Sequence, residues 1–132
     1  MKKAQLQWIL RGVAAIILLQ TLYFKFSGAE ESIYIFSTLG IEPYGRIGSG
    51  IAEAIVSILL VIPRTTWLGA LGGVGVMGGA ILSHVLVLGI DVQNDGGLLF
   101  ALAILVFLSC LVLLYLDKNT ILNVLKLDKY VN

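Results

Sequence analysis

Four long apolar stretches, separated by short polar segments, constrain this chain more than any other feature of its sequence. They run over about residues 8–26, 43–62, 66–90 and 97–116. A helix that crosses a bilayer needs about 20 mainly apolar residues, because each residue adds only about 1.5 Å along the helix axis. Each stretch is long enough. The sequence therefore predicts an all-α fold, a transmembrane four-helix bundle formed by one domain over residues 1–132.

The composition agrees with a lipid environment for most side chains. Of the 132 residues, 58% are hydrophobic and 13% are charged. A soluble domain carries about 25% charged residues, so this chain has too little charge to cover a water-facing surface. Its net charge of +1, without a basic cluster, argues against nucleic acid as a partner. Cys110 is the single cysteine, which excludes an internal disulfide or a Cys-x-x-Cys redox pair.

The connection between the first two spans, residues 27–42, carries a helix signal of its own. Ser27 and Glu30 have the spacing of a capping box, in which the serine caps the helix start and the glutamate reaches back. Gly40 is a typical helix terminator. We expect a short helix that ends near Leu39 and lies on the bundle as an extracytoplasmic lid. A solvated loop is the alternative.

The distribution of lysine and arginine predicts the orientation of the chain. Most of them lie at the end of the bundle that holds both termini and the Arg64 turn, whereas the opposite end carries mostly carboxylates. Basic loops remain in the cytoplasm. We therefore expect a multi-pass protein of the cell membrane, the inner membrane of a bacterium, with cytoplasmic termini. Residues 120–131 are either an interfacial amphipathic helix or a continuation of the fourth span.

Several ionisable residues lie within the apolar spans, where each costs about 2.5–3.5 kcal/mol at mid-depth and is usually paired or functional. Spacings of three and four place Arg46 and Glu53 on one polar stripe, which must face the bundle interior. Because successive spans alternate in direction, polar residues of different spans meet at one level. The candidate ligand pocket consists of Gln20, Lys25, Glu30, Arg46, Glu53, His84 and Asp95.

Two interpretations of this polar cluster are open. In the first it is a pocket, where Glu53 and His84 could transfer a proton. In the second the groups satisfy one another: Glu53 pairs with Lys25 or Arg46, and His84 bonds to Glu53 or Gln20. A single histidine with scattered carboxylates does not supply the ligands of a zinc or iron site, so no metal is predicted.

The third span is rich in glycine at a spacing of four residues. This small-xxx-small pattern lets helix backbones approach closely. The positions that form the predicted packing interface are Gly69, Gly73, Gly75 and Gly79. Whether the packing partner lies within the chain or in a second subunit is open.

Short motifs in a fixed order resemble the DoxX-like family of small four-helix membrane proteins. They are Arg11-Gly12, Lys25-Phe26, the stretch 35–43 leading into Gly48-x-Gly50-x-x-Glu53, the turn 62–65, and a histidine late in the third span. The resemblance implies an association with membrane oxidoreductase complexes, including a thiosulfate:quinone oxidoreductase subunit. More distant relatives act as assembly or trafficking factors.

Two functions follow as hypotheses. The first is a redox-associated subunit that binds a quinone-like or other small amphipathic ligand in an outward-facing pocket. The chain has no intrinsic cofactor in this hypothesis. Whether the isolated chain catalyses a reaction is open, and a binding role without catalysis is the favoured interpretation. The second is a non-catalytic scaffold or assembly factor, whose glycine-rich span packs against other membrane subunits or a second copy of the chain.

Overall fold

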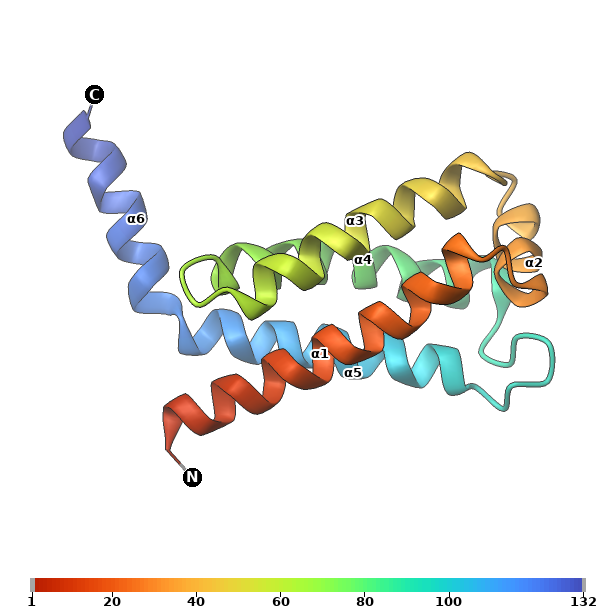
Figure 1. The fold of residues 1–132 in the computed structure, drawn as a ribbon, viewed down its shortest axis with the longest axis horizontal. Coiled ribbons are helices and arrows are strands. Elements are labelled where there is room, and N and C mark those ends of the chain that lie inside the picture. The colour runs from red at the N-terminus through yellow and green to blue at the C-terminus, as the bar shows by residue number, and fades with distance from the viewer. Residues whose placement is uncertain (1, 132) are drawn as a thin grey trace.

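A computed structural model describes the backbone of residues 2–131 and the side chains as far as residue 126. This part of the chain consists of helices joined by turns (Figure 1). The elements are α1 (Lys3–Phe26), α2 (Glu30–Thr38), α3 (Tyr44–Val61), α4 (Thr66–Ser83), the π-helix η1 (His84–Leu88), α5 (Leu98–Leu116) and α6 (Lys118–Val131). The expected all-α four-helix bundle is confirmed, and the short helix α2 lies between its first two long helices.

Four helical segments are long and apolar enough to cross a membrane: α1, α3, α4 continued by η1, and α5. In the bundle, α1 packs against α3 and α5, and α4 packs against the same two helices. Thus α1 and α4 lie diagonally opposite each other. Each helix exposes large apolar side chains on its outer face, for example Ile16, Ile58, Leu82 and Leu108. Lipid chains can cover such side chains without cost.

The two ends of the bundle differ. Figure 1 shows the start of α1, the α3–α4 turn and the end of α5 at one end, and α2 with the loop 89–97 at the other. We call the latter the α2 end. The four long helical segments therefore alternate in direction, as the apolar pattern predicted.

The predicted capping box at Ser27 and Glu30 is wrong. Ser27 instead ends α1, where its backbone N–H donates to the Tyr23 carbonyl at 3.0 Å and its hydroxyl donates to the Phe24 carbonyl at 3.4 Å. Helix α2 starts after Ala29 without a side-chain cap. Ser27 is therefore the C-terminal cap of α1 and not the N-terminal cap of α2.

The third apolar stretch does not form a uniform α-helix. After Ser83 the backbone widens into the π-helix η1, and it ends at Gly89, whose φ of +81° lies in the left-handed region that favours glycine. The segment therefore stops before Ile90. Isolated π-turns of this kind often occur at functional sites.

Helix α6 is separate from α5. A turn at Asp117 divides them, and the Asp117 carboxylate accepts a hydrogen bond of 2.7 Å from the Gln7 side chain of α1. Figure 1 shows α6 leaving the bundle at an angle, so it is not a straight continuation of the fourth span. Its placement in the membrane interface stays a prediction, and its side chains beyond Lys126 lie outside the described residues.

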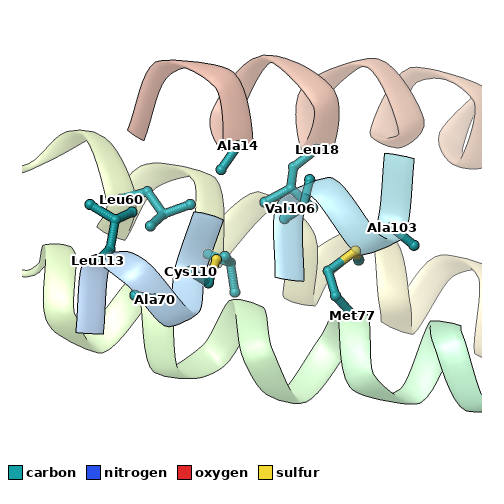
Figure 2. Packing of buried hydrophobic residues seen from close by; sticks show 10 residues of the cluster. Ala14, Leu18, Leu60, Ala70, Met77, Ala103, Val106, Cys110 and Leu113 are labelled. Atoms are coloured by element: carbon teal, nitrogen blue, oxygen red, sulfur yellow. The ribbon is translucent and has the colours of Figure 1, made fainter. Parts of the chain in front are cut away.

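The apolar core fills the middle of the bundle and the end that lies opposite α2. Figure 2 shows it running from Leu60 and Leu113 at one end to Met77 and Ala103 at the other. Cys110 is fully buried within it, in contact distance of the position that a Cβ on Gly73 would take. Cys110 is therefore part of the packing.

Two arginines connect α1 and α3 at opposite ends. Arg11 of α1 donates to the carbonyls of Leu60 and Val61 in the last turn of α3, both at 2.6 Å. Arg46 in the first turn of α3 donates to the carbonyl of Lys25 in the last turn of α1. Carbonyls of the last helical turn have no intrahelical partner and carry partial negative charge, which a cation satisfies. We call these contacts the two arginine clamps.

Candidate functional site

A cavity of about 510 Å³ lies among α1, α3, α4 and α5 at the α2 end of the bundle. Most of its wall is apolar, and α2 contributes Phe36 and Ile35 to it. Its polar side chains are Gln20, Thr21, Lys25, Glu31, Ser32, Ser49, Glu53, Ser83, His84 and Asp95. The cavity begins where the core ends, since Leu18, Met77 and Ala103 belong to both.

Glycines on α4 leave this space open. Gly75 and Gly79 line the cavity one helical turn apart, and a Cβ built on either would meet nothing within 4 Å. A Cβ at either position therefore meets open space, and both positions border the cavity. The predicted packing positions on α4 thus divide into two groups.

The other two glycines contact neighbouring helices of the same chain. A Cβ on Gly69 would lie 2.7 Å from the backbone nitrogen of Leu60, and one on Gly73 would lie 2.5 Å from Cys110 Sγ. These positions let α4 approach α3 and α5 closely. Whether any of the four glycines also packs against a second subunit stays a prediction.

A buried ion pair lies on the cavity wall. Lys25 Nζ, near the end of α1, donates to a Glu53 carboxylate oxygen. The other oxygen accepts a hydrogen bond of 3.1 Å from the Thr21 hydroxyl, one turn earlier in α1. Glu53 is 1% exposed, so these two partners take the place of water around its carboxylate oxygens. Lys25 has further N–H groups, and its side chain is 16% exposed, so it is the partner that a ligand can reach.

Two of the expected pocket residues are not among those that line the cavity. Arg46 lies behind the wall, where its Nε donates at 2.8 Å to Glu42 and its guanidinium binds the Lys25 carbonyl. It thereby holds the backbone that carries the Lys25 ammonium. Glu30 is exposed at the start of α2, and the next residue, Glu31, lines the cavity instead.

His84 is held rigidly at the start of η1. Its Nδ1 lies 3.0 Å from the carbonyl oxygen of Gly89, and its own carbonyl accepts a bond of 2.7 Å from the Gly89 N–H. The Phe100 ring packs edge-on against the imidazole, with ring centroids 5.5 Å apart. The side chain is 3% exposed and lines the cavity. In the described residues, it bonds neither to Glu53 nor to Gln20, the two partners that the sequence suggested.

Asp95 borders the cavity and organises the loop that leads into α5. Its carboxylate accepts backbone hydrogen bonds from Val92, Gly97 and Leu99 at 2.8–3.1 Å. Partial burial acts to raise the pKa of this carboxyl, but the backbone hydrogen bonds from Val92, Gly97 and Leu99 act in the opposite direction, and the net pKa is lowered. The pKa therefore lies below its usual value, and Asp95 stays ionised above that value.

Sequence reasoning did not select Thr21 or Ser32. Thr21 precedes Lys25 by four residues, which places both on one face of α1. That spacing was a usable signal. Ser32 is 7% exposed on α2 and lines the cavity, and its role depends on how α2 docks, which no local pattern indicates.

The chain matches the model of one known protein family. The family model of DoxX matches residues 6–87 of the chain, which is more than half of it. The chain belongs to the DoxX family. DoxX proteins are small multi-pass membrane proteins, which agrees with the four apolar helices seen here. No curated protein and no solved structure matched the chain. The DoxX match includes Lys25, Glu53 and His84, and it ends before Asp95 and α5.

Proposed function

We propose that this DoxX protein binds a small amphipathic molecule, of the quinone-like class, in the cavity beneath α2. Its role would be that of a ligand-binding membrane subunit associated with a redox complex. The chain would supply the binding site, and the electron donor or acceptor would be another subunit. The observation that carries the proposal is the Lys25–Glu53 ion pair on the wall of an otherwise apolar cavity.

The size and lining of the cavity support this class of ligand. Small-molecule sites usually measure about 300–1,000 Å³ and combine apolar walls with a few polar groups. The cavity of about 510 Å³ falls within that range. A ring with polar oxygens would lie near Lys25, and an apolar tail would contact the side chains of Phe36, Leu102 and their neighbours.

The position of the ion pair argues against a purely structural role. Buried ion pairs contribute little net stability, and apolar replacements often serve as well. Here Lys25 is partly exposed to a cavity, so its ammonium can donate to a ligand oxygen while it stays paired with Glu53.

We further propose that the protein lies in the cell membrane with both termini in the cytoplasm. Lys2, Lys3, Arg64 and Lys118 all belong to the end of the bundle opposite α2. Positive residues favour the cytoplasmic side. The cavity and α2 would then face the outer side, where a ligand could enter from the outer leaflet. Accessibility labelling of single cysteines in the 62–65 turn and in α2 tests this orientation.

The binding proposal is tested with purified protein in nanodiscs. Thermal unfolding is measured with a short-chain ubiquinone and a short-chain menaquinone over a concentration series. A ligand at 100 times its Kd stabilises the native state by about 2.7 kcal/mol. We expect such a concentration-dependent rise in Tm for the unmodified protein. If neither quinone raises Tm, the quinone-like assignment is rejected.

A matched pair of variants locates the binding site. Gly75→Leu places a side chain where a Cβ meets nothing and the cavity lies alongside. Gly48→Leu makes the same change on α3, where a Cβ also meets nothing but the residue does not line the cavity. We expect the ligand-dependent rise in Tm to disappear in Gly75→Leu and to persist in Gly48→Leu. An unchanged rise in both would place the ligand elsewhere.

A further inference from the structure

Two buried polar side chains on the cavity wall, His84 and Ser32, have polar atoms without a hydrogen-bond partner in the described part of the chain. His84 is 3% exposed and Ser32 is 7% exposed, and both line the cavity. They belong to η1 and α2, which are in contact with each other. This pair is distinct from the Lys25–Glu53 pair, whose polar atoms are already joined.

The hydrogen bond to Gly89 occupies Nδ1 of His84. Nε2 is then the ring nitrogen that is left for another partner. A carbonyl oxygen can only accept, so Nδ1, at 3.0 Å from the Gly89 oxygen, carries the proton. In a neutral imidazole the other nitrogen, Nε2, then has a free lone pair.

Both free atoms keep some accessible surface. Among the described side chains, every fully enclosed nitrogen or oxygen has a hydrogen-bond partner. Neither Nε2 of His84 nor the hydroxyl of Ser32 forms a bond within the described chain, so neither atom is fully enclosed. Both residues line the cavity, so a molecule bound there is the partner that these atoms can meet.

We propose that His84 Nε2 accepts a hydrogen bond from a hydroxyl group of the bound amphipath, with the Ser32 hydroxyl as a second contact. This inference rests on the proposed binding function and narrows its ligand class. A hydroxyl can donate to Nε2 and accept from Ser32, whereas a carbonyl oxygen can only accept. The cavity therefore selects the hydroxyl-bearing form of an amphipath, as in a quinol or a lipid alcohol, over the carbonyl or ether form.

The test compares ligands that differ only in this group. Decylubiquinol, held reduced under anaerobic conditions, is compared with decylubiquinone and with the dimethyl ether of the quinol. A second arm compares 1-dodecanol with dodecyl methyl ether. The two arms together show whether the site prefers the aromatic hydroxyl of a quinol or the hydroxyl of an aliphatic alcohol. Kd values are measured from ligand-dependent Tm shifts. We expect the hydroxyl form to bind at least about fivefold more tightly in one or both arms, the equivalent of one hydrogen bond.

Two variants of His84 assign the preference to a single nitrogen. The amide nitrogen of asparagine can replace Nδ1 and donate to Gly89, but His84→Asn has no group at the position of Nε2. His84→Gln places an amide near Nε2 instead. We expect the hydroxyl preference to be lost in His84→Asn and retained in His84→Gln. Ser32→Ala, which makes the smallest change to packing, is expected to reduce the preference in part.

The outcomes separate this inference from the proposed function. Equal affinity for hydroxyl and ether forms, or tighter binding of the quinone, overturns the role of His84 and leaves ligand binding in the cavity intact. A preference that persists unchanged in both His84→Asn and Ser32→Ala also overturns it. Absence of binding by every ligand, including in the unmodified protein, overturns the proposed function itself.

Discussion

Arg11 Nε donates a hydrogen bond of 2.6 Å to the carbonyl oxygen of Leu60, across the interface between α1 and α3. Arg11 is 4% exposed and also lies over the Trp8 ring, with its guanidinium carbon 3.8 Å from the ring centroid. A buried guanidinium in an apolar span needs such partners, because an unpaired charge there is costly. The residue therefore has a structural task that its position in the sequence alone did not reveal.

Replacement of Arg11 should weaken the bundle. In Arg11→Met the carbonyl of Val61 loses this donor, while that of Leu60 keeps the Thr66 hydroxyl at 3.1 Å. Hydrogen bonds to charged groups contribute about 1.5–3 kcal/mol, and we expect the free energy of unfolding to fall by about that amount. Denaturant unfolding in detergent micelles measures it. Lys3→Met, on the exposed start of α1, is the control and should change stability little.

The two halves of the Lys25–Glu53 pair should respond differently to replacement. Lys25→Met leaves the carboxylate of Glu53, at 1% exposure, with only the Thr21 hydroxyl, and we expect a loss of about 3–5 kcal/mol. Glu53→Gln leaves Lys25 with access to the cavity, so its cost should be smaller. The double variant Lys25→Met with Glu53→Leu should recover part of the loss. Equal costs for the two single variants would contradict this asymmetry.

Asp95 should contribute stability that depends on pH. Its carboxylate accepts three backbone hydrogen bonds, and its pKa is lowered in the folded protein from the usual 3.8. A group with a lowered folded pKa stabilises the protein fully above its unfolded pKa, and this stability is lost as pH falls through the folded pKa.

We therefore expect Asp95→Ala to cost about 1 kcal/mol at pH 7, a typical value for a lost cap. The difference between Asp95→Ala and the unmodified protein should shrink as the pH is lowered below about 4. Asp95→Asn keeps an acceptor oxygen and should cost less at neutral pH. Thermal unfolding across a pH series checks this, and a difference that stays constant down to pH 2 would argue against the carboxylate as the cause.

The glycines of α4 should differ in their tolerance of alanine. A Cβ on Gly69 would lie 2.7 Å from the Leu60 backbone nitrogen, which cannot move independently of α3. We expect Gly69→Ala to cost about 1–3 kcal/mol, the range for overpacking. A Cβ on Gly79 meets nothing, and alanine favours a helix by up to about 1 kcal/mol over glycine, so Gly79→Ala should be neutral or stabilising. Thermal unfolding of both variants tests this contrast.

The sequence was sufficient for the course of the chain through the bundle but not for the details of the site. The length of an apolar stretch and the position of Gly40 are properties of neighbouring residues in the sequence. The spans and the end of α2 could therefore be predicted. Ser27 was misassigned because one serine lies between two helices that compete for it. The partners of Arg11 and His84 are backbone carbonyls, and no side-chain pattern in a sequence indicates which carbonyl lies opposite.

The question of pocket or closed network could not be decided from residue types. Both interpretations placed Lys25, Glu53 and His84 at one level. What distinguishes them is volume, which depends on how closely four helices approach. The structure contains a paired network and an open cavity together, because Lys25 joins Glu53 while Gly75 and Gly79 leave space beside them.

The two arginine clamps also limit how the bundle can move. Arg11 binds the end of α3 and Arg46 binds the end of α1, at opposite ends of one antiparallel helix pair. Translation of either helix along the other by one turn, about 5.4 Å, would break both contacts at once. The clamps therefore oppose sliding between α1 and α3, whereas neither arginine holds α2 or α5 in this way.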